Sequence, residues 1–94
     1  MNTTLIDGCK RNLENPDSFP IPEPEAKELI RPGSYVKLMF ATTACAERMW
    51  VLTTARNGAK LKGTLSNEPF LLSDDLALGD QVAFTLDNVI DIQD

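Results

Sequence analysis

Residues 47–66, ERMWVLTTARNGAKLKGTLS, decide the fold. Residues 47–55 are rich in aromatic and β-branched side chains, which is typical of a strand. Asn57-Gly58 follows, a dipeptide that tolerates the positive φ angles of a tight hairpin. In residues 59–66, alternation places Leu61, Gly63 and Leu65 on one inner face, and the glycine predicts a bend or bulge. The segment therefore predicts a strongly bent antiparallel hairpin.

Alternating apolar residues predict further short strands on either side of this hairpin. Residues 35–41 place Val36, Leu38 and Phe40 on one face, residues 81–86 bury every second side chain, and residues 89–92 form a last edge strand or helical turn. Five or six short strands joined by tight turns favour a closed or nearly closed barrel, because closure removes exposed edges. We expect a mainly β chain with short N-terminal helices (α+β). An SH3-like barrel is the preferred architecture and an OB-like barrel is the alternative.

The first third of the chain has a different character, since five of the six prolines precede residue 33. We expect residues 1–32 to form a helical, proline-rich extension packed on a barrel of residues 33–94. Thr3 or Thr4 is predicted to cap a short helix that ends before Asn15-Pro16 and carries Leu5, Ile6, Cys9 and Leu13. A second short helix is expected from about residue 24 to 30, with proline at its start.

Composition and charge exclude several classes of function. The 94 residues allow one domain, and the net charge of −5 is unevenly distributed. All nine basic residues lie at or before Lys62, so the chain up to that point carries +2 and the rest −7. An acidic third of this kind disfavours nucleic acid; it is either a solvated face that keeps a small domain soluble, which is the commoner case, or a surface that meets a basic protein. No apolar run is long enough to span a membrane and no signal peptide is recognisable, so we expect a cytoplasmic protein.

The sequence contains few of the residues and motifs that are typical of catalytic sites. Histidine is absent, and neither Cys9 nor Cys45 has a recognisable partner base, so we expect two reduced thiols and no enzyme activity. No glycine-rich nucleotide-binding motif is present, so no cofactor is expected. Asp74, Asp75 and Asp80 cluster near one turn, but their spacing departs from that of a calcium loop. No metal site is therefore predicted, and solvated turn or capping roles are expected for these carboxylates.

Candidate contact residues lie on the central strand and on the segment that follows the hairpin. Arg48 and Trp50 share one face of the strand; Trp50 either fills the core, which is the favoured interpretation, or is a partly exposed anchor beside Arg48. Asn67 is expected to bond its own backbone in a turn with Glu68. The predicted partner-binding residues are Arg48, Trp50, Asn67, Glu68, Asp74, Asp75 and Asp80.

Three of these motifs together resemble a bacterial family of small domains of unknown function. They are an E-R-M-W-V strand (47–51), a G-T-L-x-N-x-P turn (63–69) and a closing segment that begins G-D-x-V-x-F (79–84). The resemblance covers roughly residues 15–92 and implies a compact domain with much β-structure. Some members resemble immunity proteins that neutralise secreted toxins. The matching residues are Glu47, Arg48, Trp50, Gly63, Asn67, Pro69, Gly79, Asp80 and Asp91.

Two functional hypotheses follow. The first is a non-enzymatic protein-binding module, in its immunity-like form an acidic surface that covers a basic toxin. The alternative is a regulatory domain that binds a small ligand at a pocket in the barrel mouth, or a divalent metal at the C-terminal aspartates. We expect a monomer or a weak homodimer, and neither nucleic acid nor a membrane as partner.

Overall fold

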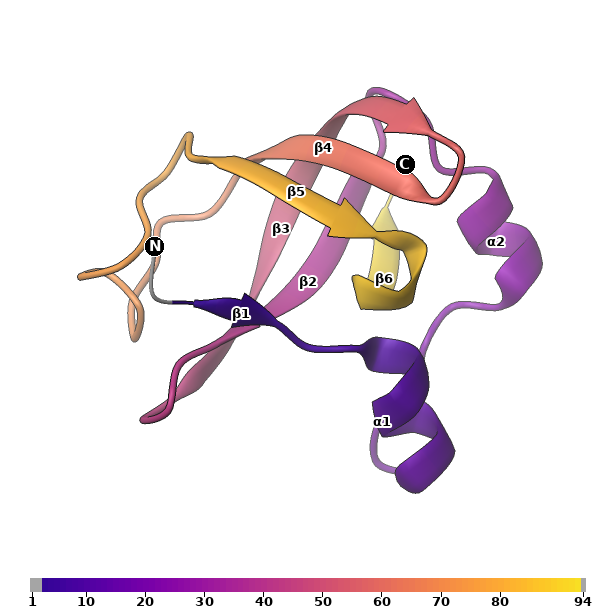
Figure 1. Ribbon diagram of the computed structural model, residues 1–94, viewed down its shortest axis with the longest axis horizontal. Coiled ribbons are helices and arrows are strands. Elements are labelled where there is room, and N and C mark those ends of the chain that lie inside the picture. Colours follow the sequence, from indigo (N-terminus) through magenta and orange to yellow (C-terminus); the bar gives the residue numbers. More distant parts are fainter. Residues whose placement is uncertain (1–2, 94) are drawn as a thin grey trace.

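The computed structural model of the protein describes residues 3–93. The predicted hairpin lies at the centre of the sheet. Strands β3 (Ala46–Asn57) and β4 (Lys60–Leu65) pair antiparallel (Figure 1). Asn57 faces Lys60 across a two-residue loop, and Gly58 adopts a φ of 64°. Glycine at the first loop position is what type II′ hairpins require. The hairpin prediction is confirmed, with Gly58 rather than Asn57 in the left-handed conformation.

A bulge bends this hairpin where the sequence predicted it. The pairing register of β3 shifts between Thr53 and Ala55, and Thr53 lies opposite Gly63 of β4. A Cβ atom at Gly63 would lie 2.5 Å from the carbonyl oxygen of Leu52 and 2.5 Å from Cγ1 of Val51. Only glycine therefore allows the two strands to approach this closely, and the resulting bend curls the sheet.

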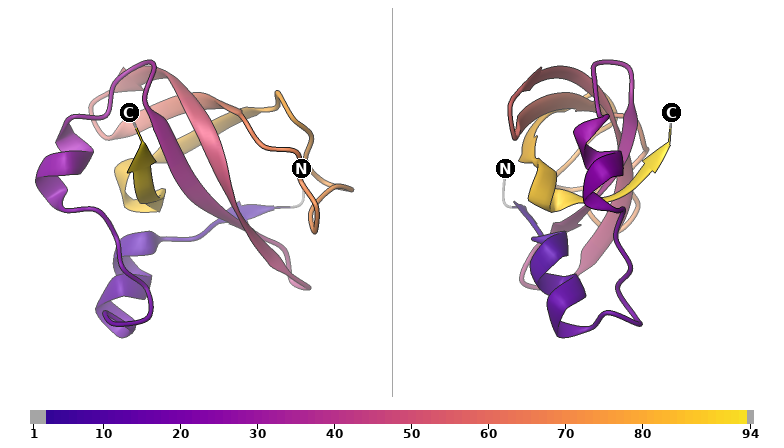
Figure 2. Two further views of the ribbon diagram at one scale, coloured as in Figure 1. Left: turned by 180° about the vertical axis from the view of Figure 1, so that it is seen from behind. Right: turned by 90° about the vertical axis from the view of Figure 1, so that its right-hand side faces the viewer.

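The sheet curls into a nearly closed barrel (Figures 1 and 2). Along the sheet the strand order is β1 (Thr4–Leu5), β2 (Tyr35–Ala41), β3, β4 and β5 (Gln81–Thr85), with all described pairs antiparallel. After the short 3-10 helix η1 (Leu86–Asn88), β6 (Val89–Gln93) returns to pair with β2. The predicted small α+β barrel is confirmed, whereas the choice between SH3-like and OB-like types stays a prediction.

The core fills the inside of this barrel with the residues that alternation had placed inward. Val36, Leu38 and Phe40 of β2 are buried, as are Leu61, Gly63 and Leu65 of β4. The inner face of β3 consists of Met49, Val51 and Thr53. Strand β5 adds Val82 and Phe84, and the segment between β4 and β5 adds Leu72 and Leu76. That last segment thus belongs to the core as well as to the surface.

The N-terminal part differs from the prediction at its start. Thr4 and Leu5 pair with Ala41 and Phe40 of β2, so they are extended and the expected helix cap at Thr3 or Thr4 is wrong. Helix α1 (Gly8–Glu14) begins later, and the side chain of its N-cap Asp7 accepts a 3.0 Å hydrogen bond from the Lys10 amide. The helix ends at Asn15, as predicted. Leu5 therefore packs from a strand, and Leu13 of the helix is exposed.

Helix α2 (Pro24–Glu28) has proline in its first turn, as expected, and is tied to the barrel by Arg56 of β3. The Nη1 atom of Arg56 donates hydrogen bonds to the carbonyl oxygens of Lys27, Glu28 and Ile30, at 3.1, 3.1 and 2.8 Å. Both helices lie at the end of the barrel that carries the β3–β4 turn (Figures 1 and 2). Within residues 3–93 no helix has the length and apolar character needed to cross a membrane.

Candidate functional site

The segment between β4 and β5, residues 66–80, is the most unusual surface of the protein, and we call it the acidic loop. Its inward side chains Pro69, Leu72 and Leu76 are buried. Some of its outward side chains are apolar too, because Phe70 is 82% exposed and Leu71 is also exposed. A loop that is apolar on both sides is anchored in the core and still presents an aromatic ring to solvent.

A carboxylate from the neighbouring strand fixes the backbone beneath Phe70. Glu47 of β3 accepts hydrogen bonds from three successive amides, those of Phe70, Leu71 and Leu72, at 3.0, 2.9 and 3.1 Å for the shortest contact of each. Successive N–H groups that point at one anion form a concave nest, and here the anion is part of the protein. Charge-assisted hydrogen bonds of this kind are stronger than neutral ones. The conformation that displays Phe70 is therefore held from inside.

The acidic loop that carries this ring is negatively charged. Glu68 and Asp74 are exposed and Asp75 is half-buried, and the loop contains no basic residue. Asp80 has a different role, since its carboxylate accepts a 2.9 Å hydrogen bond from the Ala77 amide and closes the turn before β5. Asp80 is therefore a turn residue, and the alternative helix-cap role is wrong because residues 66–80 contain no helix. Within the part of the chain that the structure describes, no group of three or more acidic or cysteine side chains is arranged to hold a metal ion.

Asn67 and Trp50 come together, although not as expected. The side-chain oxygen of Asn67 accepts a hydrogen bond from the Trp50 backbone amide, and the Ser66 amide donates to the Trp50 carbonyl at 2.9 Å. Asn67 thus extends the pairing of β3 and β4 by one residue, so the prediction that it bonds its own backbone is wrong. It ties the start of the acidic loop to the central strand.

Trp50 lies on the outer face of β3, so the favoured interpretation that it fills the core is wrong. Met49 and Val51 are buried, whereas Trp50 is half-buried. The Lys37 ammonium covers its ring at 4.8 Å from the centroid. Met49 shares the inner face of β3 with Thr53. Thr53 lies opposite Gly63 in the bend that closes the barrel, so this face of the strand becomes the inside.

Arg48 shares the outer face with Trp50, as the alternation predicted. Its guanidinium lies 5.1 Å from the centroid of the Phe19 ring, which pins the N-terminal segment to the barrel. Beside it is a groove of about 410 Å³ between residues 19–22 and strands β2 and β6. Glu47 and Arg48 are consecutive in the strand and leave it on opposite faces. The predicted site residues therefore divide between the acidic loop and this separate patch.

The thiols also have neighbours that the sequence did not reveal. The Cys9 sulfur lies 3.5 Å from the Lys27 ammonium and 3.5 Å from a carboxylate oxygen of Asp87. Lys27 is 6% exposed and also donates a 2.9 Å hydrogen bond to the Leu86 carbonyl. The sequence showed no recognisable partner base for Cys9, whereas the structure places a lysine and an aspartate beside its thiol. The geometry shows a lysine that links α2, α1 and η1, with both cysteines free.

Similarity to a known protein family covers most of the barrel of this chain, without β1. No curated protein and no solved structure matches the chain. One family model matches residues 25–93, which comprise α2 and the strands from β2 to β6. The match covers more than half of the chain, and it confirms the predicted bacterial family at the level of the family itself. The chain belongs to the family described as "Uncharacterized protein conserved in bacteria (DUF2314)".

Proposed function

We propose that the protein is a non-enzymatic protein-binding module that uses the acidic loop as its contact surface. One observation carries the proposal: Phe70 is 82% exposed on a backbone that three hydrogen bonds to Glu47 hold in place. A large apolar side chain that is rigidly displayed costs little ordering entropy when it binds. Aromatic anchors of this kind dominate the energetics of many interfaces.

The charge around Phe70 defines the partner. Glu68, Asp74 and Asp75 belong to the same loop as Phe70, and the acidic loop contains no basic residue. The partner therefore has a basic surface around an apolar cavity that receives the ring. Complementary charge accelerates association and rejects acidic competitors, whereas the buried ring supplies most of the affinity. In the immunity-like form of the proposal, this basic partner is a toxin.

The contacts of the titratable groups support binding rather than catalysis. Lys27 is occupied by the Leu86 carbonyl and the Cys9 sulfur, and Glu47 by the loop amides. Asp80 is occupied by the Ala77 amide. These groups hold backbone segments together, which is a structural role. Arg48 and Trp50 stay predicted contacts of the separate outer patch.

The test begins with a photo-crosslinker in place of the exposed side chain. A benzoyl-phenylalanine at position 70 is expressed in the bacterial host and irradiated, with the same residue at position 13 as the matched control. Leu13 is also 82% exposed, but it lies on α1, far from the acidic loop. We expect an adduct with one protein from position 70 that does not form from position 13.

The adduct protein is then purified and titrated against defined variants. We expect Phe70→Ser to weaken binding at least about 10-fold, as removal of a buried aromatic anchor does. Asp74→Asn with Asp75→Asn is expected to lower the association rate and its dependence on salt. Leu13→Ser is expected to bind like the wild type. Equal affinity of Phe70→Ser and wild type, or equal crosslinking from both positions, would contradict the proposal.

A further inference from the structure

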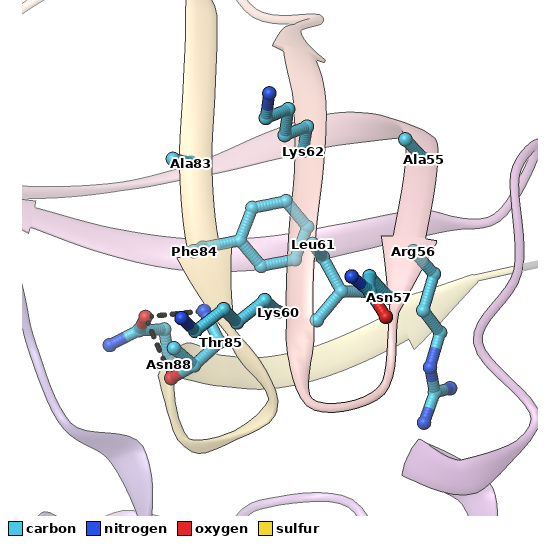
Figure 3. Close-up of a pocket in the computed structure, with 10 residues that line it drawn as sticks. All are labelled: Ala55, Arg56, Asn57, Lys60, Leu61, Lys62, Ala83, Phe84, Thr85 and Asn88. Carbon is cyan, nitrogen blue, oxygen red and sulfur yellow. Dashed lines mark hydrogen bonds between the residues drawn. The ribbon is translucent and has the colours of Figure 1, made fainter.

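A second surface lies at the other end of strands β4 and β5, where a pocket of about 580 Å³ spans three neighbouring strands. The strand register explains its shape. Ala55 of β3, Lys62 of β4 and Ala83 of β5 lie side by side in one row across the sheet. Two alanines on either side of a lysine leave a depression, because a methyl group covers far less of the sheet than a long side chain. Figure 3 shows Lys62 between these two alanines.

A second row of paired residues on the same outer face of the sheet forms one edge of the pocket. Asn57, Lys60 and Thr85 are paired with one another across the same three strands. Lys60 and Lys62 are two residues apart in β4, so both side chains leave the strand on the outer face. Both are exposed. Between the two rows, Leu61 and Phe84 point into the core and support the sheet from behind.

The pocket is basic, although the chain as a whole carries a net charge of −5. Its lining includes Arg56, Lys60 and Lys62, and none of the described residues that line it is acidic. Arg56 is already occupied by three carbonyl oxygens of the α2 segment. Within residues 3–93, the ammonium groups of Lys60 and Lys62 have no hydrogen-bond or ion-pair partner. Two cations without partners therefore lie within the pocket, Lys62 between the two alanines and Lys60 in the neighbouring row.

We propose that this pocket binds a small amphipathic organic anion. The anionic head lies between the ammonium groups of Lys60 and Lys62, and the apolar body lies on Ala55 and Ala83. The volume is within the range of small-molecule sites, about 300–1,000 Å³. A free anion without an apolar body gains only the weak interaction of exposed charges, and an apolar cation is repelled. The combination of both features in one molecule is what the pocket selects.

Octanoate is the probe, because it has one carboxylate and a chain short enough for the depression. The labelled protein is titrated with octanoate, and amide shifts are followed by NMR. We expect the largest amide shifts in the two rows that line the pocket, which are residues 55, 62 and 83 and residues 57, 60 and 85. We expect no shifts at the amides of residues 70–72. Octyltrimethylammonium, which has the same chain and the opposite charge, and propionate, which has the same head and almost no chain, are expected to bind at least about 10-fold more weakly.

Two variants test the two halves of the pocket separately. Lys60→Gln with Lys62→Gln removes both positive charges, keeps polar side chains that are one atom shorter, and is expected to weaken octanoate binding about 10-fold. Lys10→Gln, on the exposed part of α1, is the matched control and is expected to bind like the wild type. Ala83→Leu fills the depression from an exposed position of β5 and is expected to abolish binding with little change in melting temperature.

The proposal is overturned if octanoate binds the double glutamine variant as tightly as the wild type. It is equally overturned if the amide shifts map to the acidic loop. It stands independently of the protein-binding proposal, because Phe70→Ser is expected to leave octanoate binding unchanged. A Phe70→Ser variant that loses octanoate would show that the probe simply finds the exposed aromatic ring.

Discussion

Replacing Glu47 by glutamine tests how the acidic loop is held. Glutamine is isosteric, but it has one acceptor oxygen instead of two and carries no charge. Three amides, those of Phe70, Leu71 and Leu72, now bond to the Glu47 carboxylate. Hydrogen bonds to charged groups contribute about 1.5–3 kcal/mol and neutral ones about 0.5–1.5 kcal/mol, so the loss is about 1 kcal/mol per amide. Glu47 is only half-buried, and we therefore expect a total loss of about 2 kcal/mol.

The loss is expected in global stability, because the acidic loop is part of the core. Leu72 is 1% exposed and Leu76 is 3% exposed, so the loop cannot detach without opening the barrel. A chain of this size has a total stability of about 5–10 kcal/mol, and the variant therefore stays folded. A loss of about 2 kcal/mol corresponds to a fall in Tm of about 8–16 °C. Urea unfolding, monitored by circular dichroism, measures the same quantity at constant temperature.

Hydrogen exchange gives the local readout of the same change. A loss of about 2 kcal/mol predicts roughly 30-fold faster exchange of the amides of residues 70–72. Glu14→Gln is the matched control, since Glu14 is exposed at the end of α1, and it is expected to change neither quantity. If Glu47→Gln behaves like this control in both assays, the carboxylate does not hold the loop. The rigid display of Phe70 would then be wrong.

Three further outcomes test the rest of the structure. Gly63→Ala is expected to lower the free energy of unfolding by about 2 kcal/mol in urea, because its Cβ would lie 2.5 Å from a backbone oxygen; a neutral result would contradict the close strand approach. Arg56→Lys is expected to cost about 1–2 kcal/mol and to speed amide exchange in α2, since an ammonium cannot reproduce the guanidinium contacts with three carbonyls. Trp50 is expected to be quenched by acrylamide in the native state, because its ring is half-buried on the outer face; an unquenched native emission would place it in the core.

The strands were predictable from the sequence because strand alternation is a local signal. Val36, Leu38 and Phe40 are buried where their period of two placed them, and Gly63 marks the bend. Trp50 was misplaced because both faces of its strand carry apolar residues, so periodicity could not choose between them. Only the closure of the barrel, which no single strand encodes, selects the face of Met49.

The contacts that define the candidate surfaces link residues far apart in the sequence. Glu47 bonds to amides more than 20 residues away, and nothing near it in the sequence indicates that pairing. Phe70 lies in a short apolar stretch, and which of its side chains are buried depends on how the stretch packs against the rest of the core. Thr4 is predicted as a helix cap, but it pairs with Ala41, a strand partner more than 30 positions away that the local sequence does not reveal. The sequence showed the acidity of the C-terminal third, and the structure shows that part of it lies on the loop that exposes Phe70.

The lengths of β4 and β5 explain how one acidic and one basic surface coexist on a chain of 94 residues. The acidic loop connects the end of β4 to the start of β5 (Figure 1), whereas the pocket lies where β4 begins and β5 ends. Five residue steps separate Lys60 from Leu65, which corresponds to about 16 Å along an extended strand. That distance is about twice the Debye length of about 8 Å at physiological salt, so the two sets of charges barely neutralise each other. Each surface therefore keeps its own sign, and variants at one are expected to leave binding at the other unchanged because distant sites act additively.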